Sequence, residues 1–192
     1  MSEGGFHVHG PHDHELEHAA QHSKPGSASG RIAVTTAIIA TVGAMAAYMG
    51  GATQANAGLF KNNAAIKKTE ASNQWNYYQA KSSKQNLAEL ALALVPEDRK
   101  ALYQTDVERY KKEKAEIKLA AEKLEADSTA WDHQSDEQMH LHHRWAQATT
   151  ALQISIALAA IALLTRRRWL EYGVYGVAGL GALLGAAALA GW

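Results

Sequence analysis

Three long apolar stretches, none with a charged residue near its middle, constrain the fold of this chain more than any other feature. They occupy residues 32–52, 146–164 and 169–192, and only the third holds a charge, Glu171 near its start. About 20 consecutive apolar residues let a helix cross the hydrocarbon layer of a bilayer. Such a helix satisfies all of its backbone polar groups within itself. We therefore predict an all-α membrane protein with three transmembrane helices.

These spans divide the 192 residues into six segments. Between the first and second spans lies a polar segment that holds most of the 19 basic and 19 acidic residues of the chain. The predicted segments are a His-rich flexible tail at 1–30, a transmembrane helix at 31–52, a helical hairpin at 53–148, a second transmembrane helix at 149–165, an arginine turn at 166–168 and a third transmembrane helix at 169–192.

The polar segment is predicted to be a long antiparallel hairpin that resembles a coiled coil. Its only break is the turn at 95–97, where Pro96 cannot continue a helix interior. Apolar residues recur every seven positions on each side of this turn, a period typical of a left-handed supercoil. The predicted core rows are Leu59, Ile66, Ala80, Leu87 and Leu94 in the first arm, and Tyr103, Tyr110, Ile117, Leu124, Trp131 and Trp145 in the second. Asn73 interrupts the first row and is expected to set the register of the packing.

Charge near the membrane predicts the orientation. Arg166, Arg167 and Arg168 form a compact basic turn, and short basic loops stay in the cytoplasm. The N-terminal tail is then cytoplasmic and the hairpin is extracytoplasmic. Aromatic and basic side chains favour the headgroup region, so the predicted membrane-interface residues are Arg144, Trp145, Arg166, Arg167, Arg168, Trp169 and Trp192.

Histidines suggest two candidate metal sites. The tail carries His7, His9, His12, His14 and His18, and neutral imidazoles bind zinc, copper or nickel. The alternative is a polar leader whose charge changes near the imidazole pKa. Asp136, His140 and His143 share one face of a helix, and the alternative there is a polar surface next to the membrane. No other cofactor is predicted.

Two further clusters are predicted to make packing contacts. Trp75, Tyr77 and Tyr78 are expected to pack against the second arm or, as the preferred reading, against another subunit. Gly181 and Gly185 allow close approach of helix backbones in lipid. Their partner is either the chain's own first span or a neighbouring subunit.

Three stretches of the chain resemble a known family. They are Ala-Ser-Asn-Gln-Trp-Asn-Tyr-Tyr-Gln-Ala-Lys-Ser-Ser-Lys-Gln at 71–85, His-His-Arg-Trp at 142–145 and Ile-Ala-Leu-Leu-Thr-Arg-Arg-Arg-Trp at 161–169. They are similar to an uncharacterised bacterial membrane-protein family catalogued as domain of unknown function 4337. The resemblance implies three spans and a helical ectodomain, and it implies no activity. The predicted location is the bacterial inner membrane.

Composition excludes several classes of function. A formal net charge of zero argues against nucleic-acid binding. The sequence contains no phosphate-binding loop and no nucleophile elbow, so we expect that this protein is not an enzyme. The middles of the spans lack ionisable residues, which argues against ion-coupled transport. The predicted function is a self-associating scaffold whose partners are the bilayer and its own copies. The alternatives are a metal-binding or metal-responsive protein and, more weakly, an oligomeric channel.

Overall fold

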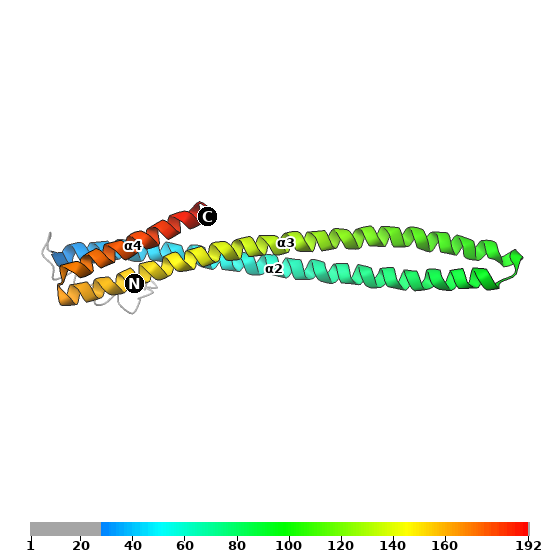
Figure 1. Ribbon diagram of the computed structural model, residues 1–192, viewed down its shortest axis with the longest axis horizontal. Coiled ribbons are helices and arrows are strands. Elements are labelled where there is room, and N and C mark those ends of the chain that lie inside the picture. The colour runs from blue at the N-terminus through cyan, green and yellow to red at the C-terminus, as the bar shows by residue number, and fades with distance from the viewer. Residues whose placement is uncertain (1–27, 192) are drawn as a thin grey trace, which may run out of the picture. The chain divides into compact units, whose positions relative to one another are not determined.

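The computed structural model describes residues 28–191 and consists of three α-helices (Figure 1). Helix α2 runs over Ala28–Leu94, α3 over Glu97–Thr165 and α4 over Arg168–Leu189. No strand occurs within these described residues, so the predicted all-helical class is confirmed. Each helix is long and apolar enough to cross a membrane, by length and composition alone.

Two of the helices are much longer than a membrane span. Helix α2 has 67 residues and α3 has 69, so the apolar runs and the polar arms belong to the same helices. Neither helix contains a proline after its first turn, and proline is the residue that most strongly ends a helix. Gly50 and Gly51 lie inside α2 without breaking it. Each costs about 1 kcal/mol relative to alanine, which packing of a long helix offsets.

The first turn lies where the sequence predicts it. Helix α2 ends at Leu94, and α3 starts at Glu97 directly after Pro96. Proline disfavours the helical conformation in the residue before it, here Val95, and thereby separates the two helices. The backbone N–H of Arg99 donates to the carbonyl of Pro96 at 3.0 Å. Glu97 and Asp98 place negative charge at the positive end of the α3 dipole.

The second turn joins α3 to α4 through arginines. Arg166 adopts a φ of 50°, a left-handed conformation that is uncommon for residues other than glycine. Its N–H donates to the carbonyl of Ala162 at 2.9 Å and so closes the last turn of α3. Arg167 is extended and precedes the first residue of α4.

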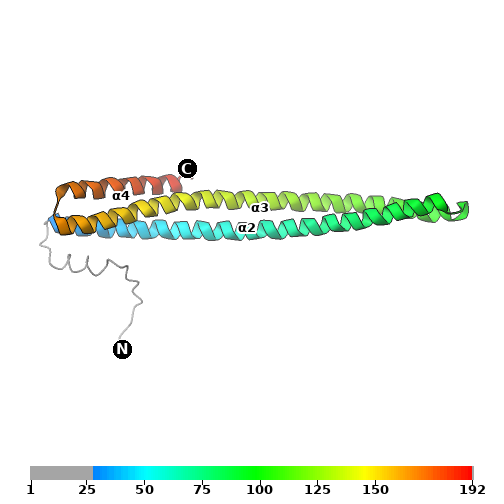
Figure 2. The ribbon, with the colours of Figure 1, turned by 60° about the horizontal axis from the view of Figure 1, so that its bottom comes forward.

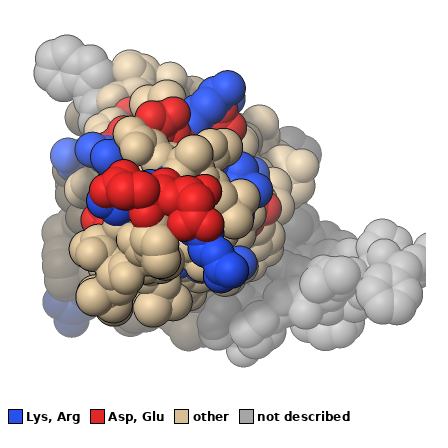
Figure 3. Space-filling model, turned by 90° about the vertical axis from the view of Figure 1, so that its right-hand side faces the viewer, with Lys and Arg blue, Asp and Glu red and all other residues tan. Residues whose placement is uncertain are grey.

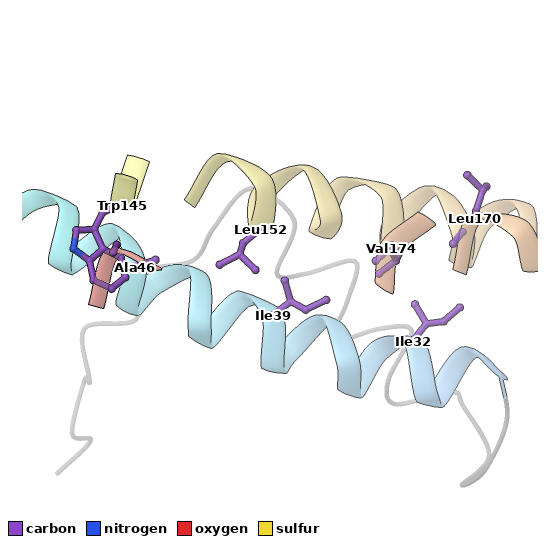
Figure 4. Close-up of a cluster of buried hydrophobic side chains, with 10 residues drawn as sticks. Ile32, Ile39, Ala46, Trp145, Leu152, Leu170 and Val174 are labelled. Atoms are coloured by element: carbon purple, nitrogen blue, oxygen red, sulfur yellow. The ribbon is translucent and has the colours of Figure 1, made fainter. Parts of the chain in front are cut away.

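The chain divides into two compact units. Among the described residues, the first unit comprises residues 28–54 and 139–191, and the second comprises residues 55–138. In the first unit, apolar side chains of α2, α3 and α4 form one cluster (Figure 4). Ile39 of α2 and Leu152 of α3 point toward each other in that view, and both are at most 6% exposed.

In the second unit, the α2 and α3 segments lie side by side in both ribbon views (Figures 1 and 2). The α3 row at Tyr103, Tyr110, Ile117, Leu124 and Trp131 is buried or half-buried, as the seven-residue period predicts. Its α2 counterpart differs from the prediction, because small residues fill the contact. The buried apolar residues of α2 in this unit are Ala57, Ala64, Ala71 and Ala88.

The predicted core row of the first arm is wrong. Leu59, Ile66, Leu87 and Leu94 are 56%, 47%, 66% and 76% exposed, and Asn73 is also exposed. The physical reason is that alanine lets two helix backbones approach more closely than leucine does. The helices pack through the alanine row, which leaves the larger side chains of the leucine row outside.

Candidate functional site

Two serine hydroxyls of α3 hydrogen-bond to the backbone of α2 in the second unit. Ser128 Oγ donates to the carbonyl oxygen of Ala64, and Ser135 Oγ donates to that of Ala57, each at 2.9 Å. Both serines are buried. A side chain as short as serine reaches a backbone carbonyl only when the helices are close, and alanine at the acceptor positions permits this. The serines and their acceptors are both seven residues apart.

The same seven-residue spacing recurs in the first unit at His142. Its Nδ1 lies 2.8 Å from the carbonyl oxygen of Gly50. A carbonyl can only accept, so Nδ1 carries the proton in this bond and Nε2 stays free for other interactions. A Cβ at Gly50 would lie 3.3 Å from Cβ of Trp145, which is tighter than ordinary contacts. Glycine at this position therefore permits close packing of α2 against α3.

An ion pair between aromatic rings lies in the second unit. Lys81 Nζ of α2 is 2.5 Å from a carboxylate oxygen of Glu113 of α3, and their side chains are 14% and 33% exposed. The same Nζ lies 5.1 Å from the ring centre of Tyr77 and 5.6 Å from that of Tyr110, within cation–π range. The hydrogen bond from Lys81 lowers the pKa of Glu113, and the bond to Glu113 raises the pKa of Lys81. Both groups are thereby held in their charged forms.

In the aromatic cluster Trp75, Tyr77 and Tyr78, side chains contact the second arm of the same chain. Trp75 Nε1 donates to a carboxylate oxygen of Glu125 at 3.2 Å, and its ring meets Tyr78 edge-on at 5.7 Å. Lys114 of α3 lies 4.9 Å from the ring centre of Tyr78. Trp75 and Tyr78 therefore pack on the second arm of the same chain, and their contact with another subunit stays a prediction. Tyr77 remains 50% exposed.

The glycines of α4 pack on α3, which is neither of the two predicted partners. A Cβ at Gly181 would lie 2.8 Å from Cγ of Leu152, and one at Gly185 would lie 3.7 Å from the Trp145 ring. These faces are therefore occupied within the chain. Gly179 has no atom within 4 Å of its would-be Cβ.

The position of Trp145 agrees with its predicted place in the seven-residue core row of the second arm and not with a place against lipid headgroups. Its side chain is only 6% exposed and belongs to the apolar cluster of the first unit. The reason is that Gly50 and Gly185 leave room for an indole between the helices. Arg144, Arg166, Arg167 and Arg168 are exposed, as is Trp169, and a headgroup location for them stays a prediction. Trp192 lies outside the described residues.

The candidate metal ligands are not brought together in the described part of the chain. Within residues 28–191, no group of three or more His, Asp or Glu side chains is placed to hold a metal ion. Asp136, His140 and His143 are each exposed and do not form such a group. The tail positions His7, His9, His12, His14 and His18 lie outside the described residues.

The close interhelical contact was missed by sequence reasoning. Its signal is a row of small residues at seven-residue spacing in α2, namely Gly43, Gly50, Ala57, Ala64 and Ala71, all of them buried. Such a row is easily overlooked, because apolar periodicity is read from large side chains. Ser128 and Ser135 show the same spacing on α3.

These features define a class of protein: all-helical, with three helices able to span a membrane by length and with contacts built from small and polar side chains. The chain belongs to the family described as Domain of unknown function (DUF4337), whose family model matches residues 28–191. The resemblance seen in the sequence is thus confirmed. No curated protein and no solved structure gave a match.

Proposed function

We propose that this protein is a membrane-anchored helical scaffold that associates with copies of itself. In this proposal three helices span the bacterial inner membrane, and residues 53–148 form an extracytoplasmic coiled-coil-like hairpin. At a rise of 1.5 Å per residue, an arm of about 40 residues extends roughly 60 Å from the bilayer. The arginine turn and the N-terminal tail lie in the cytoplasm, which agrees with the positive-inside rule.

One observation carries the proposal. Several large apolar side chains of α2 in the second unit are exposed, with Leu59, Leu87 and Leu94 more than half exposed. Apolar faces of helices need a covering layer, and extended exposed apolar surface commonly marks protein–protein contact. The interhelical contacts described above are structural in kind, because they join buried hydroxyls to backbone carbonyls and a lysine to a glutamate. A self-associating scaffold accounts for both features.

The orientation is tested by labelling cysteines in intact cells. The chain has no cysteine, so a single introduced cysteine is the only residue of the protein that a maleimide can label through a thiol. We expect an impermeant maleimide to label Thr105→Cys, whose position is exposed in the second unit, in intact cells. We expect Ser27→Cys to react only after permeabilisation. Labelling of Ser27→Cys but not Thr105→Cys in intact cells would reverse the proposed orientation.

Self-association is tested on the full chain without an affinity tag. Native mass spectrometry from detergent micelles, in buffer with a metal chelator, is expected to show a defined oligomer. Crosslinking in isolated membranes with a lysine-reactive reagent is expected to give the same subunit number. A monomer in both measurements would contradict the scaffold proposal.

A further inference from the structure

One face of α2 in the second unit has an unusual composition. It includes a row of six residues spaced by seven, which we call the outer row: Leu59, Ile66, Asn73, Ala80, Leu87 and Leu94. All six are exposed. On one side of the outer row lie the rows that start at Asn62 and Gly58, which repeat every seven residues and hold only Gly, Ala, Ser, Thr, Asn, Gln and Leu. On its other side lies the row that starts at Asn63, which holds Glu70 and Lys84. The outer face, defined as the outer row together with the rows that start at Asn62 and Gly58, carries no charge from residue 58 to residue 94.

The opposite side of the same pair is different. The outward positions of α3 carry Glu108, Lys112, Glu116, Glu122 and Lys123, all of them exposed. Helix faces that meet water are typically charged or strongly polar, as this one is. Charged side chains of both signs also lie at the end where α2 and α3 are joined (Figure 3). The uncharged face of α2 is therefore unlike a solvated helix face.

We propose that two copies of this chain, anchored in the same membrane, pair through the outer face of α2 in a parallel and in-register arrangement. This inference rests on the proposed function and names the surface that performs the self-association. A two-fold contact brings each patch against itself. Any charge at the centre of such a patch would face the same charge on the other copy, and like-charge contacts weaken an interface. A face without charge is suited to this arrangement.

The period of the outer row indicates a helical partner. A row that keeps a seven-residue period stays in line only along a partner helix of the same supercoil. The second copy presents the same helix with the same period.

Asn73 decides between parallel and antiparallel pairing. In a parallel pair it lies opposite Asn73 of the second copy, and the two amides can donate to and accept from each other. A single buried asparagine pair of this kind fixes register in coiled coils. In an antiparallel pair that keeps the six positions matched, Asn73 would lie opposite Ala80 and lose this partner. Anchoring both chains in one membrane also makes the α2 helices parallel.

The size of the face is sufficient for a specific contact. Residues 59–94 extend over about 54 Å at 1.5 Å per residue, and a helix is roughly 10 Å wide. Two such strips bury about 1,000 Å² in total, the lower end of specific interfaces. Anchoring in one bilayer raises the effective concentration of the partners and supports pairing through a contact of this size.

Disulfide trapping in membranes tests the geometry. Asn73→Cys and Ala80→Cys, each alone in the cysteine-free chain, are expected to form homotypic dimers on mild oxidation, because a parallel pair brings identical positions together. Glu116→Cys on the outward side of α3 is the matched control and is expected to stay monomeric. Crosslinking only between a mixture of the Asn73→Cys and Ala80→Cys chains would overturn the parallel register.

A charge substitution tests the surface itself. Leu87→Lys places like charges opposite each other in the pair, and we expect association to fall at least tenfold. Leu119→Lys is the control, because Leu119 on α3 is 68% exposed and Leu87 is 66% exposed. Both variants should keep the wild-type helix content by circular dichroism, since neither side chain is buried.

The outcomes separate this inference from the proposed function. If Leu87→Lys and wild type form the same oligomer and Asn73→Cys does not crosslink, the outer face is not the interface, although the scaffold proposal stands. If the wild-type chain is monomeric in native mass spectrometry and in membrane crosslinking, both proposals fail.

Discussion

Replacing Gly181 with alanine tests how closely α3 and α4 approach each other. The new Cβ would lie 2.8 Å from Leu152 Cγ, 3.0 Å from Cδ2 and 3.2 Å from the backbone nitrogen of Leu152. Contacts below 3.0 Å do not persist, so the leucine must shift. Leu152 is only 2% exposed, so its side chain is packed on all sides. The backbone nitrogen can move only together with α3.

The size of the effect follows from two opposing contributions. Inserting a methyl group into a well-packed core costs about 1–3 kcal/mol. Replacing glycine with alanine inside a helix gains about 1 kcal/mol. We expect Gly181→Ala to lower the free energy of unfolding by about 1 kcal/mol, a decrease in Tm of roughly 2–4 °C for a chain of this length. Gly179→Ala meets no atom within 4 Å and should raise the Tm by a similar amount.

The assay is thermal unfolding of the full chain in detergent, followed by near-ultraviolet circular dichroism of its tryptophans. The expected order of Tm is Gly179→Ala, then wild type, then Gly181→Ala. Combining Gly181→Ala with Leu152→Ala should cost less than the sum of the two single changes, because the smaller side chain makes room for the methyl group. If Gly181→Ala unfolds at or above the temperature of Gly179→Ala, the close approach of α3 and α4 is refuted.

Three further predictions concern other contacts. Ser128→Ala should lower the free energy of unfolding by about 0.5–1.5 kcal/mol through loss of its interhelical hydrogen bond, whereas the exposed Ser83→Ala should leave it unchanged in the same chemical denaturation. Because its partner lysine lowers the pKa of Glu113, that carboxylate stabilises the fold above its unfolded-state pKa and loses this contribution as the pH falls through the folded-state pKa. Glu113→Gln should therefore show a smaller loss of Tm between neutral and acidic pH than wild type, and an equal loss would contradict the ion pair. Trp145→Ala should cost about 3–5 kcal/mol, measured by unfolding, because it empties a buried site; a cost below 1 kcal/mol would place the indole outside the core.

Helix type and helix ends were predictable because they depend on local chemistry. Proline at position 96 separates α2 from α3 whatever the helices later contact. The three apolar runs similarly indicate long helices from their composition alone. The row from Tyr103 to Trp131 was found correctly, because its large side chains lie on the buried side of α3.

The candidate site was less predictable, because several of its partners are far apart in the sequence. Ser128 and Ala64 are separated by 64 residues, and Lys81 and Glu113 by 32. Nothing local to either residue specifies its partner. Trp75 and Tyr78 were recognised as packing residues, but their particular partners on the second arm, Glu125 and Lys114, became evident only in the structure.

The sequence by itself determined that this chain forms long helices, where they end and how often apolar side chains recur along them. Only the tertiary structure decided which of two rows in α2 faces α3. Both the alanine row and the leucine row keep a seven-residue period, so periodicity cannot distinguish them. The choice depends on how closely two backbones approach, and Ala57 and Ala64 allow the serines of α3 to reach backbone carbonyls. That close contact leaves Leu59, Leu87 and Leu94 on the outside, where the pairing surface is proposed.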